Sequence, residues 1–319
     1  MKIIKFITIG LLIAGAIFAS GCKKEDNLIN PNNEELIEMW NITNDGGDIP
    51  WGIAMSSDGI IYISELSGSR IKKFTSTGTL IKNWGTFGNN NGEFWWPKDI
   101  TLDRNNNIYV ADEKNHRIQK FDSSGTYIAQ WEVDFAGTIS ADFENDWIYT
   151  INQLNVLQKF DLSGNLITHW GGTGSGDGQL MLSNQDNPAS QGPNGQMVVS
   201  KTGNIFVVDN MNFRVQMFSS SVTFITKWGS QGNGAGQFLY PSGIAIDNEN
   251  DFIYVSDNNK QFGGSGNIAR IQKFDLSGNF IKQWILSDLP DQEIGRLAVD
   301  EAGNVLSIQG SRLVKYAFK

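Results

Sequence analysis

The sequence predicts an all-β fold, a six-bladed β-propeller of four-stranded antiparallel blades. Two sequence elements each occur six times, and no useful length of chain after the N-terminal segment has a helical period. One element is an outer strand that ends in tryptophan, with copies at residues 36–40, 80–84, 127–131, 166–170, 224–228 and 280–284. The other is a short β-run that ends in a polar residue, with copies at residues 61–65, 108–112, 148–152, 205–209, 253–257 and 305–309. Four-stranded units repeated at roughly 40–50 residues are typical of propeller blades.

Each unit contains four strands in a fixed order. An inner strand such as residues 243–247 leads into the second strand, through turns whose Asp and Gly content suits short hairpins. A third strand follows, and in five units it begins with arginine: Arg70, Arg117, Arg214, Arg270 and Arg312. The third unit lacks this arginine and starts its third strand near Val156, so we expect its blade to depart most from the others. The outer-strand tryptophans are expected to pack between blades.

The two sets of six repeats are offset by one element, which predicts how the ring closes. The sixth unit ends at its third strand, residues 313–318, and has no outer strand of its own. Residues 36–40 form an outer strand that precedes the first complete unit. The N-terminal strand is therefore expected to complete the last blade.

Two kinds of segment resemble the NHL repeat. Residues 107–112 read Asn-Ile-Tyr-Val-Ala-Asp, and residues 115–121 read Asn-His-Arg-Ile-Gln-Lys-Phe, with the Asn-His pair that gives the repeat its name. The linkers at residues 85–97 and 229–241 share the pattern Gly-x-x-Gly-x-x-x-Gly-[Gln/Glu]-Phe-x-x-Pro. The resemblance covers residues 35–319. It implies a propeller and leaves the function open, because the family includes enzymes, RNA binders and protein-binding modules.

The N-terminus reads as a targeting segment. Lys2 and Lys5 precede an uncharged apolar run, residues 6–19, that is short for a membrane span and suits a signal peptide. The run ends in Ala19-Ser20-Gly21-Cys22, which resembles the lipobox of bacterial lipoproteins and implies a diacylglycerol and an acyl chain on Cys22. We therefore expect a signal peptide at residues 1–21, a polar tether at 22–34 and the propeller at 35–319. The alternative is ordinary cleavage near Ala19 and a soluble periplasmic protein.

The tether and the composition bear on location and partners. Residues 23–26, Lys-Lys-Glu-Asp, resemble tags that export lipoproteins to the cell surface, or they form a plain solvated tether. Loss of residues 1–21 takes the formal net charge from −9 to −11. A domain this acidic lacks the electrostatic pattern of a nucleic-acid binder. We expect the lipid on Cys22 to anchor it to the outer membrane or the cell surface. We expect a monomer, and Cys22, as the sole cysteine, excludes an internal disulfide.

An acid at the end of the second strand and an arginine at the start of the third recur together. The pairs are Glu65 with Arg70, Asp112 with Arg117, Asp209 with Arg214, and Asp257 with Arg270. An acid and an arginine across a short turn form a hydrogen-bonded pair that shapes the loop. Because one active site does not need several copies, the repetition favours a structural role.

Aromatic residues near the linker ends suggest a binding face. In an up-and-down blade, the linkers and the loops after the second strand emerge on the same face, which would also collect residues 182–194. The candidate ligand-binding residues on this face are Trp51, Trp96, Tyr240, Asn258, Asn259 and Phe262. Aromatic rings beside amide side chains suit a sugar or a peptide. The alternative is that these rings only cover the ends of the core.

No catalytic constellation can be assembled from the sequence. His116 and His169 are the only histidines, too few for a three-histidine zinc site, and Cys22 is committed to lipid. The first hypothesis is a non-catalytic binding module for a glycan, peptide or protein, without a cofactor. The second is a lyase or lactonase with calcium at the propeller axis, held by Asp, Asn and Gln oxygens.

Overall fold

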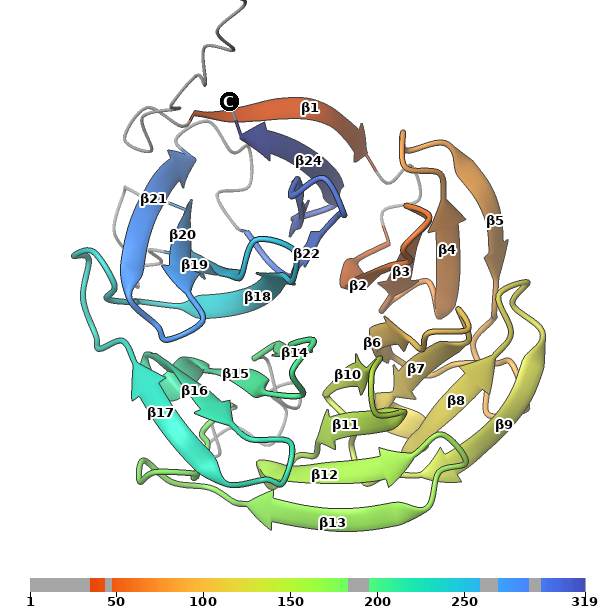
Figure 1. The fold of residues 1–319 in the computed structure, drawn as a ribbon. Helices are drawn as coiled ribbons and strands as arrows, with labels where there is room; N and C mark the ends of the chain where they lie inside the picture. Colours follow the sequence, from red (N-terminus) through yellow and green to blue (C-terminus); the bar gives the residue numbers. More distant parts are fainter. Residues whose placement is uncertain (1–34, 44–47, 183–194, 259–268, 287–293, 319) are drawn as a thin grey trace, which may run out of the picture. The chain divides into compact units, whose positions relative to one another are not determined.

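The computed structural model describes residues 35–43, 48–182, 195–258, 269–286 and 294–318. The signal segment, Cys22, Asn259, Phe262 and nearly all of residues 182–194 lie outside these ranges. The chain divides into Met1–Glu34 and Glu35–Lys319, and the second unit forms six four-stranded antiparallel sheets arranged in a ring (Figure 1).

Each blade takes four consecutive strands from the axis outward, except the last, whose outer strand comes from the N-terminal side. Blade one is β2 (Pro50–Met55), β3 (Ile61–Glu65), β4 (Arg70–Phe74) and β5 (Leu80–Trp84); blade two is β6 (Pro97–Leu102), β7 (Ile108–Asp112), β8 (Arg117–Phe121) and β9 (Tyr127–Glu132). Blade three is β10 (Thr138–Asp142), β11 (Trp147–Ile151), β12 (Val156–Asp161) and β13 (Leu166–Gly171); blade four is β14 (Met197–Val199), β15 (Ile205–Asp209), β16 (Arg214–Phe218) and β17 (Phe224–Trp228). Blade five is β18 (Pro241–Asp247), β19 (Phe252–Asn258), β20 (Ala269–Asp275) and β21 (Phe280–Leu286); blade six is β22 (Leu297–Val299), β23 (Val305–Gln309), β24 (Arg312–Phe318) and β1 (Leu36–Thr43).

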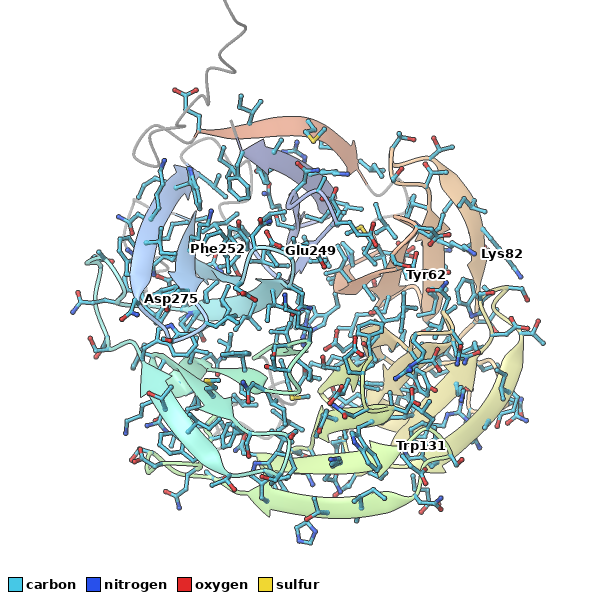
Figure 2. The ribbon with its side chains drawn as sticks, viewed as in Figure 1. Tyr62, Lys82, Trp131, Glu249, Phe252 and Asp275 are labelled. Carbon is cyan, nitrogen blue, oxygen red and sulfur yellow. The ribbon has the colours of Figure 1, made fainter. Side chains whose placement is uncertain are left out.

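The position of a strand in its blade determines its side-chain pattern. The second strand β7 is buried at every residue, because it has a strand on each side and a neighbouring blade over each face. The outer strand β9 alternates between half-buried and exposed residues, so only one of its faces packs. Figure 2 shows side chains filling the spaces between blades, with Trp131 toward the outside of blade two.

The outer-strand tryptophans join neighbouring blades. Trp84 of blade one packs edge-on against Phe121 of blade two, with ring centroids 6.3 Å apart. Trp170–Phe218 makes the same edge-on contact between consecutive blades, and three further pairs join consecutive blades with tilted rings: Trp131–Phe160, Trp228–Phe274 and Trp284–Phe318. Gly164 lies directly under the Trp131 indole, where a Cβ atom would come within 2.5 Å of the ring. These contacts supply most of the aromatic packing between blades.

The ring closes by pairing the first described strand with the last. β1 is antiparallel to β24, with Leu36 opposite Phe318 and Asn41 opposite Val314. The Phe318 ring reaches Trp284 of blade five at 4.7 Å between centroids. The N-terminal strand thus completes blade six, as the sequence predicts.

Blade three has regular strand pairing despite its divergent sequence. At the end of its second strand, Asn152 replaces the acid of the other blades, and its side-chain oxygen accepts hydrogen bonds from the Leu154 and Val156 N–H groups at 3.0 Å. An asparagine can fold such a turn alone, because its side chain bonds to the backbone two residues on. The missing arginine therefore leaves the blade intact.

Candidate functional site

The acids that end the second strands hold the linkers against the blades. In blade two, the Asp112 carboxylate accepts hydrogen bonds from Arg117 Nε at 2.8 Å and from the Trp95 N–H at 2.7 Å. Arg117 also donates to the Glu93 carbonyl oxygen in the linker at 2.8 Å. Burial raises the pKa of Asp112, while hydrogen bonds from Asn115, Trp95 and Arg117 act in the opposite direction. The pair fixes the position at which the linker enters the inner strand.

The same ion pair is present in the other blades that carry both residues. Arg214 bonds to Asp209 at 2.7 Å, and Arg270 bonds to Asp257 at 2.7 Å although thirteen positions separate them. In blade one, Arg70 contacts both Glu65 and Asp48. Because each of these arginines binds within its own blade and linker, the pairs act as structural parts of the loops.

Blade six breaks this pattern and leaves room above itself. Gln309 occupies the position of the acid, and its amide group donates to Ser307 Oγ at 2.8 Å and to Tyr316 Oη at 2.7 Å. Only Gly310 and Ser311 separate β23 from β24, whereas four residues join β7 to β8. Gly310 has a φ of 56°, a left-handed conformation that suits glycine. The turn between β23 and β24 is shorter than the corresponding turns of the other five blades, and it leaves space above blade six.

A cavity of about 440 Å³ lies in this space, and we call it the upper cavity. Its lining comes mainly from the linkers into β2, β18 and β22 and from the turn between β23 and β24. Its apolar lining comes from Ile49, Pro50, Trp51, Ile294 and Ile308. Its polar lining comes from Asp48, Asn210, Tyr240, Ser242, Asn258, Arg296 and Ser311. A volume of this size is in the range of small-molecule sites.

Two of the polar lining residues mainly support the wall. Asn258 donates to the Ile294 carbonyl oxygen and accepts from the Ile294 N–H, both at 2.7 Å. Ser242 Oγ also donates to the Ile294 carbonyl oxygen, at 3.0 Å. These bonds anchor the linker into blade six to blade five. The wall is therefore held in place without a ligand.

Six residues, one from the start of each inner strand, form a ring around the axis, and one of them, Arg296, lines the upper cavity. They are Gly52, Asp99, Thr138, Gln196, Gly243 and Arg296. Arg296 reaches from blade six to blades two and three: its Nη1 lies 2.8 Å from Asp99 Oδ2, and Thr138 Oγ1 donates to the same carboxylate oxygen at 2.9 Å. Burial raises the pKa of Asp99 and lowers that of Arg296, and each charge offsets the effect on the other. This ion pair crosses the axis.

The two glycines of the ring make this crossing possible. A Cβ atom on Gly52 would come within 2.8 Å of the Asp99 Cα, and one on Gly243 would come within 2.9 Å of the Arg296 Cα. Each glycine therefore lies beside one partner of the ion pair and gives its backbone room. Gln196, at the start of blade four, connects to blades five and six. Its amide donates to the Leu297 carbonyl oxygen and accepts from the Ile244 and Leu297 N–H groups, all at 3.0 Å.

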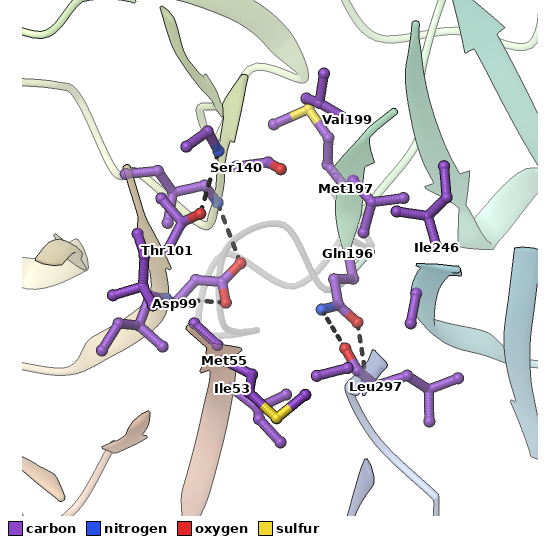
Figure 3. A pocket seen from close by; sticks show the side chains of 18 of the residues that line it. Ile53, Met55, Asp99, Thr101, Ser140, Gln196, Met197, Val199, Ile246 and Leu297 are labelled. Atoms are coloured by element: carbon purple, nitrogen blue, oxygen red, sulfur yellow. Dashed lines mark hydrogen bonds between the residues drawn. The ribbon is translucent and has the colours of Figure 1, made fainter. Parts of the chain in front are cut away.

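Below the ring lies a second, smaller cavity of about 180 Å³, the lower cavity. Figure 3 shows Asp99 and Gln196 on opposite sides of it, with apolar side chains that include Met55, Met197 and Val199 also in the lining. Of the ring residues, Arg296 lines the upper cavity, and Asp99 and Gln196 line the lower one. The ring therefore adjoins both cavities.

A fully buried ion pair stands beside the ring. Lys98 Nζ lies 3.1 Å from Glu113 Oε2, and Lys114 Nζ lies 3.3 Å from Glu113 Oε1. Lys98 also faces the Trp51 ring at 5.8 Å, and Lys114 faces the Trp96 ring at 5.0 Å. Burial lowers the pKa of Lys98 to about 8, although Glu113 opposes the change.

The structure brings some of the sequence candidates together. Trp51, Tyr240 and Asn258 line the upper cavity. Trp96, which has a left-handed φ of 62°, is outside that lining and packs on Lys114. Asn259 and Phe262 cannot be compared, because they lie outside the described residues.

Sequence reasoning missed the ring residues. Aligning the inner strands on their first buried aliphatic residue would have found them, because Asp99, Gln196 and Arg296 each precede that residue. Within the described ranges, no group of three or more His, Cys, Asp or Glu side chains suits a metal ion, and no helix is long and apolar enough to cross a membrane.

Two protein-family models match parts of the chain. A family model described as NHL repeat matches residues 94–121, and one described as 6-bladed beta-propeller matches residues 194–294. The chain is a six-bladed β-propeller whose second blade contains a match to the NHL repeat. No curated protein matches this propeller in sequence.

Solved structures resemble this propeller in fold. A streptogramin B lyase structure matches with a TM-score of 0.56 and 13% identity, over 90% of this chain and 99% of that chain. A structural genomics protein of unknown function from Bacteroides thetaiotaomicron matches with a TM-score of 0.63 and 13% identity, over 90% of this chain and 76% of that one. With 1259 matching chains, the fold by itself does not select a function.

Proposed function

We propose that this propeller is a non-catalytic binding module and that the upper cavity is its binding site. The observation that carries the proposal is the convergence, in one cavity of about 440 Å³, of two aromatic side chains with several polar groups. Trp51 and Tyr240 enter from blades one and five, on opposite sides of the low turn of blade six. Aromatic rings with few polar groups fixing the orientation are typical of sites for sugars and peptides.

The rigidity of the site supports recognition of a ligand. Asn258 and the acid–arginine pairs hold the linkers in the wall, and Asp99 holds the lining residue Arg296 in place. A site whose walls are already ordered loses little conformational freedom on binding. The ligand class is a glycan, a peptide or a segment of a partner protein.

Mutation of the aromatic lining tests the binding site. In a screen of glycans and peptides, a ligand that binds the wild type should bind Trp51→Ala and Tyr240→Ala at least about tenfold more weakly, because aromatic packing and area burial are lost. Trp95→Ala is the matched control, since Trp95 is exposed but lies outside the cavity lining. Equal losses in all three variants, or a ligand indifferent to Trp51 and Tyr240, would place binding elsewhere.

The proposal includes a lipid anchor at Cys22, which would hold the module at the outer membrane or cell surface as a monomer. The support is the sequence of residues 1–22. Cys22→Ser should abolish labelling by a clickable palmitate and release the protein from the membrane fraction. Unchanged processing and partitioning would contradict the anchor.

An enzyme at the same axis is the second candidate, as a calcium-dependent lyase or lactonase. The observation that favours it is the group of buried ionisable residues beside the cavity, because such groups gather at active sites. Metal analysis of the purified protein, with thermal unfolding before and after chelation, distinguishes the two candidates. Bound calcium with a fall in Tm on chelation would favour the enzyme.

A further inference from the structure

One asparagine in the lining of the upper cavity has a side chain without a hydrogen bond. Asn210 is the first residue after the acid that ends β15, and it is 5% exposed. Its Oδ1 atom is buried and has no hydrogen-bond partner in the part of the chain that the structure describes. A buried acceptor without a partner costs free energy, so it calls for an explanation such as a bound ligand or water.

Asn258 shows what an asparagine at this position does in the next blade. It is the first residue after Asp257, as Asn210 is the first residue after Asp209. The Asn258 amide accepts the N–H of Ile294 and donates to the carbonyl oxygen of the same residue, both at 2.7 Å. Ile294 lies in the linker into the following blade. One asparagine side chain thus holds both backbone groups of one residue.

A proline explains why Asn210 lacks the corresponding partner. In blade six, Ile294 stands two positions before the ring residue Arg296. In blade five, Pro241 stands two positions before the ring residue Gly243. Proline has no backbone N–H, so position 241 cannot donate the bond that Ile294 donates in blade six. Asn210 therefore occupies the place of a residue that binds backbone, next to a linker that has no N–H to give.

The first two blades show that such a proline does not require an asparagine. Leu66 follows the acid of blade one, and Pro97 stands two positions before the ring residue of blade two. Leu66 is buried, so an apolar side chain serves this position in the scaffold when the next linker carries a proline. The polar side chain of Asn210 is therefore not explained by packing against Pro241.

Arg296 adds an unpartnered donor to the same lining. Its side chain is 5% exposed, and its Nη1 and Nη2 atoms bond to Asp99 and to the Gly137 carbonyl oxygen. Its Nε atom is buried and has no hydrogen-bond partner among the described residues. Asn210 and Arg296 both line the upper cavity. The cavity thus offers a side-chain amide and a guanidinium donor to one ligand.

We propose that the upper cavity binds an extended peptide segment, with the N–H and carbonyl groups of one residue against the side-chain amide of Asn210. In an extended backbone both groups of a residue point to the same side, so one amide can meet both, as Asn258 does at Ile294. Rotation about the Cβ–Cγ bond of asparagine is soft, so the Asn210 amide can turn toward the ligand. A neighbouring carbonyl oxygen of the peptide accepts from Arg296 Nε. This inference rests on the proposed function, because it names the ligand class of the same cavity.

The apolar lining favours a peptide over a sugar. Ile49, Pro50, Ile294 and Ile308 line the cavity together with Trp51. An aliphatic wall suits the apolar side chain of a peptide residue, which gains free energy when it leaves water. Hydroxyl groups of a sugar would lose their water against the same wall without a new hydrogen bond. We therefore expect the bound peptide to carry an apolar side chain.

The first test compares capped tripeptides that differ in the central residue. Acetylated and amidated Ala-X-Ala peptides, with valine, leucine, phenylalanine, serine or lysine as X, would be titrated into the purified protein and followed by NMR. We expect the best apolar peptide to bind about tenfold more tightly than the serine peptide, because an apolar side chain is buried. An ester oxygen in place of the N–H that faces Asn210 should weaken binding about tenfold, because one hydrogen bond is lost.

Two variants test the role of the asparagine. Asn210→Ala should bind the best peptide about tenfold more weakly and should bind its ester analogue equally well, because the acceptor is gone. Pro241→Ala restores an N–H at position 241, so we expect Asn210 to bond there as Asn258 bonds to Ile294. The peptide should then bind more weakly, because the protein itself occupies the asparagine.

Matched controls separate these effects from a general loss of structure. Asn83→Ala changes an exposed asparagine on β5, and Pro97→Ala changes the corresponding proline of blade two; both residues are outside the cavity lining. Both controls should bind the peptide as the wild type does, and thermal unfolding checks that each variant is folded. If Pro241→Ala does not fold, the comparison of peptide and ester in Asn210→Ala still decides.

The outcomes distinguish this inference from the broader proposal. A glycan that requires Trp51 and Tyr240, with no peptide bound at millimolar concentration, would refute the peptide and leave the binding module intact. A peptide that Asn210→Ala binds as tightly as the wild type, or an ester effect that persists in that variant, would refute the inference. Peptide binding that none of the variants Asn210→Ala, Trp51→Ala and Tyr240→Ala alters would contradict both proposals.

Discussion

The buried Lys98–Glu113 pair gives the stability of the propeller a specific dependence on pH. Burial lowers the pKa of Lys98 from 10.5 to about 8 in the folded protein. Below pH 8 the lysine is charged in both states, so folding carries the full cost of burying that charge, about 3 kcal/mol. Between pH 8 and 10.5 the unfolded chain binds more protons than the folded one, so the free energy of unfolding should rise with pH.

The variant Lys98→Met removes the titrating group and keeps an apolar stem of similar length. Urea unfolding at a series of pH values should show a rise of about 3 kcal/mol in the wild type relative to the variant across this interval. Tyrosines that titrate in the same range do so in both proteins and cancel in the difference. Lys82→Met is the control, because Lys82 lies exposed on the outer strand β5, as Figure 2 shows. Parallel curves for the wild type and Lys98→Met would refute the reasoning.

Three further predictions concern the scaffold. Trp131→Ala should lower the free energy of unfolding by about 3 kcal/mol by removing the contact with Phe160, whereas the exposed Trp95→Ala should change it little; urea unfolding measures both. Gly243→Ala should cost ~1–3 kcal/mol and lower Tm in a calorimetric scan, because its Cβ would press on the backbone of Gly295 and Arg296; an unchanged Tm would mean that the ring yields. A chain that begins at residue 44 should self-associate on size-exclusion chromatography, because it exposes the edge of β24, whereas one that begins at residue 35 should elute as a monomer.

The sequence was informative wherever a local pattern repeats. The outer strands with their tryptophans and the acid–arginine pairs each occur several times. The closing role of β1 was evident because one unit has no outer strand of its own. These features depend on contacts within one blade or between adjacent blades. These features can therefore be recognised by comparing one copy of the repeat with the next.

The axial site was not predicted, because its parts do not repeat. Asp99 and Arg296 are separated by 197 positions, and the equivalent positions in other blades hold glycine, threonine or glutamine. The upper cavity depends on one short turn at Gly310 and Ser311, whose effect becomes evident only once the six units are superposed. Trp96 was grouped with Trp51 because both adjoin a linker proline, yet the backbone at Trp96 directs its ring toward Lys114.

The pairing of β1 with β24 has a consequence for the order of folding. β1 is synthesised first among the strands, but its partner is the last, so it has no hydrogen-bonding neighbour until residues 312–318 are made. A contact that spans nearly the whole chain forms slowly, because a long loop must close before the contact can contribute. Until the two strands pair, β1 is an unpaired strand and β24, once it has been made, is a free sheet edge, so any chain that stops before Arg312 leaves β1 unpaired. Completion of the ring therefore requires both residues 36–43 and residues 312–318.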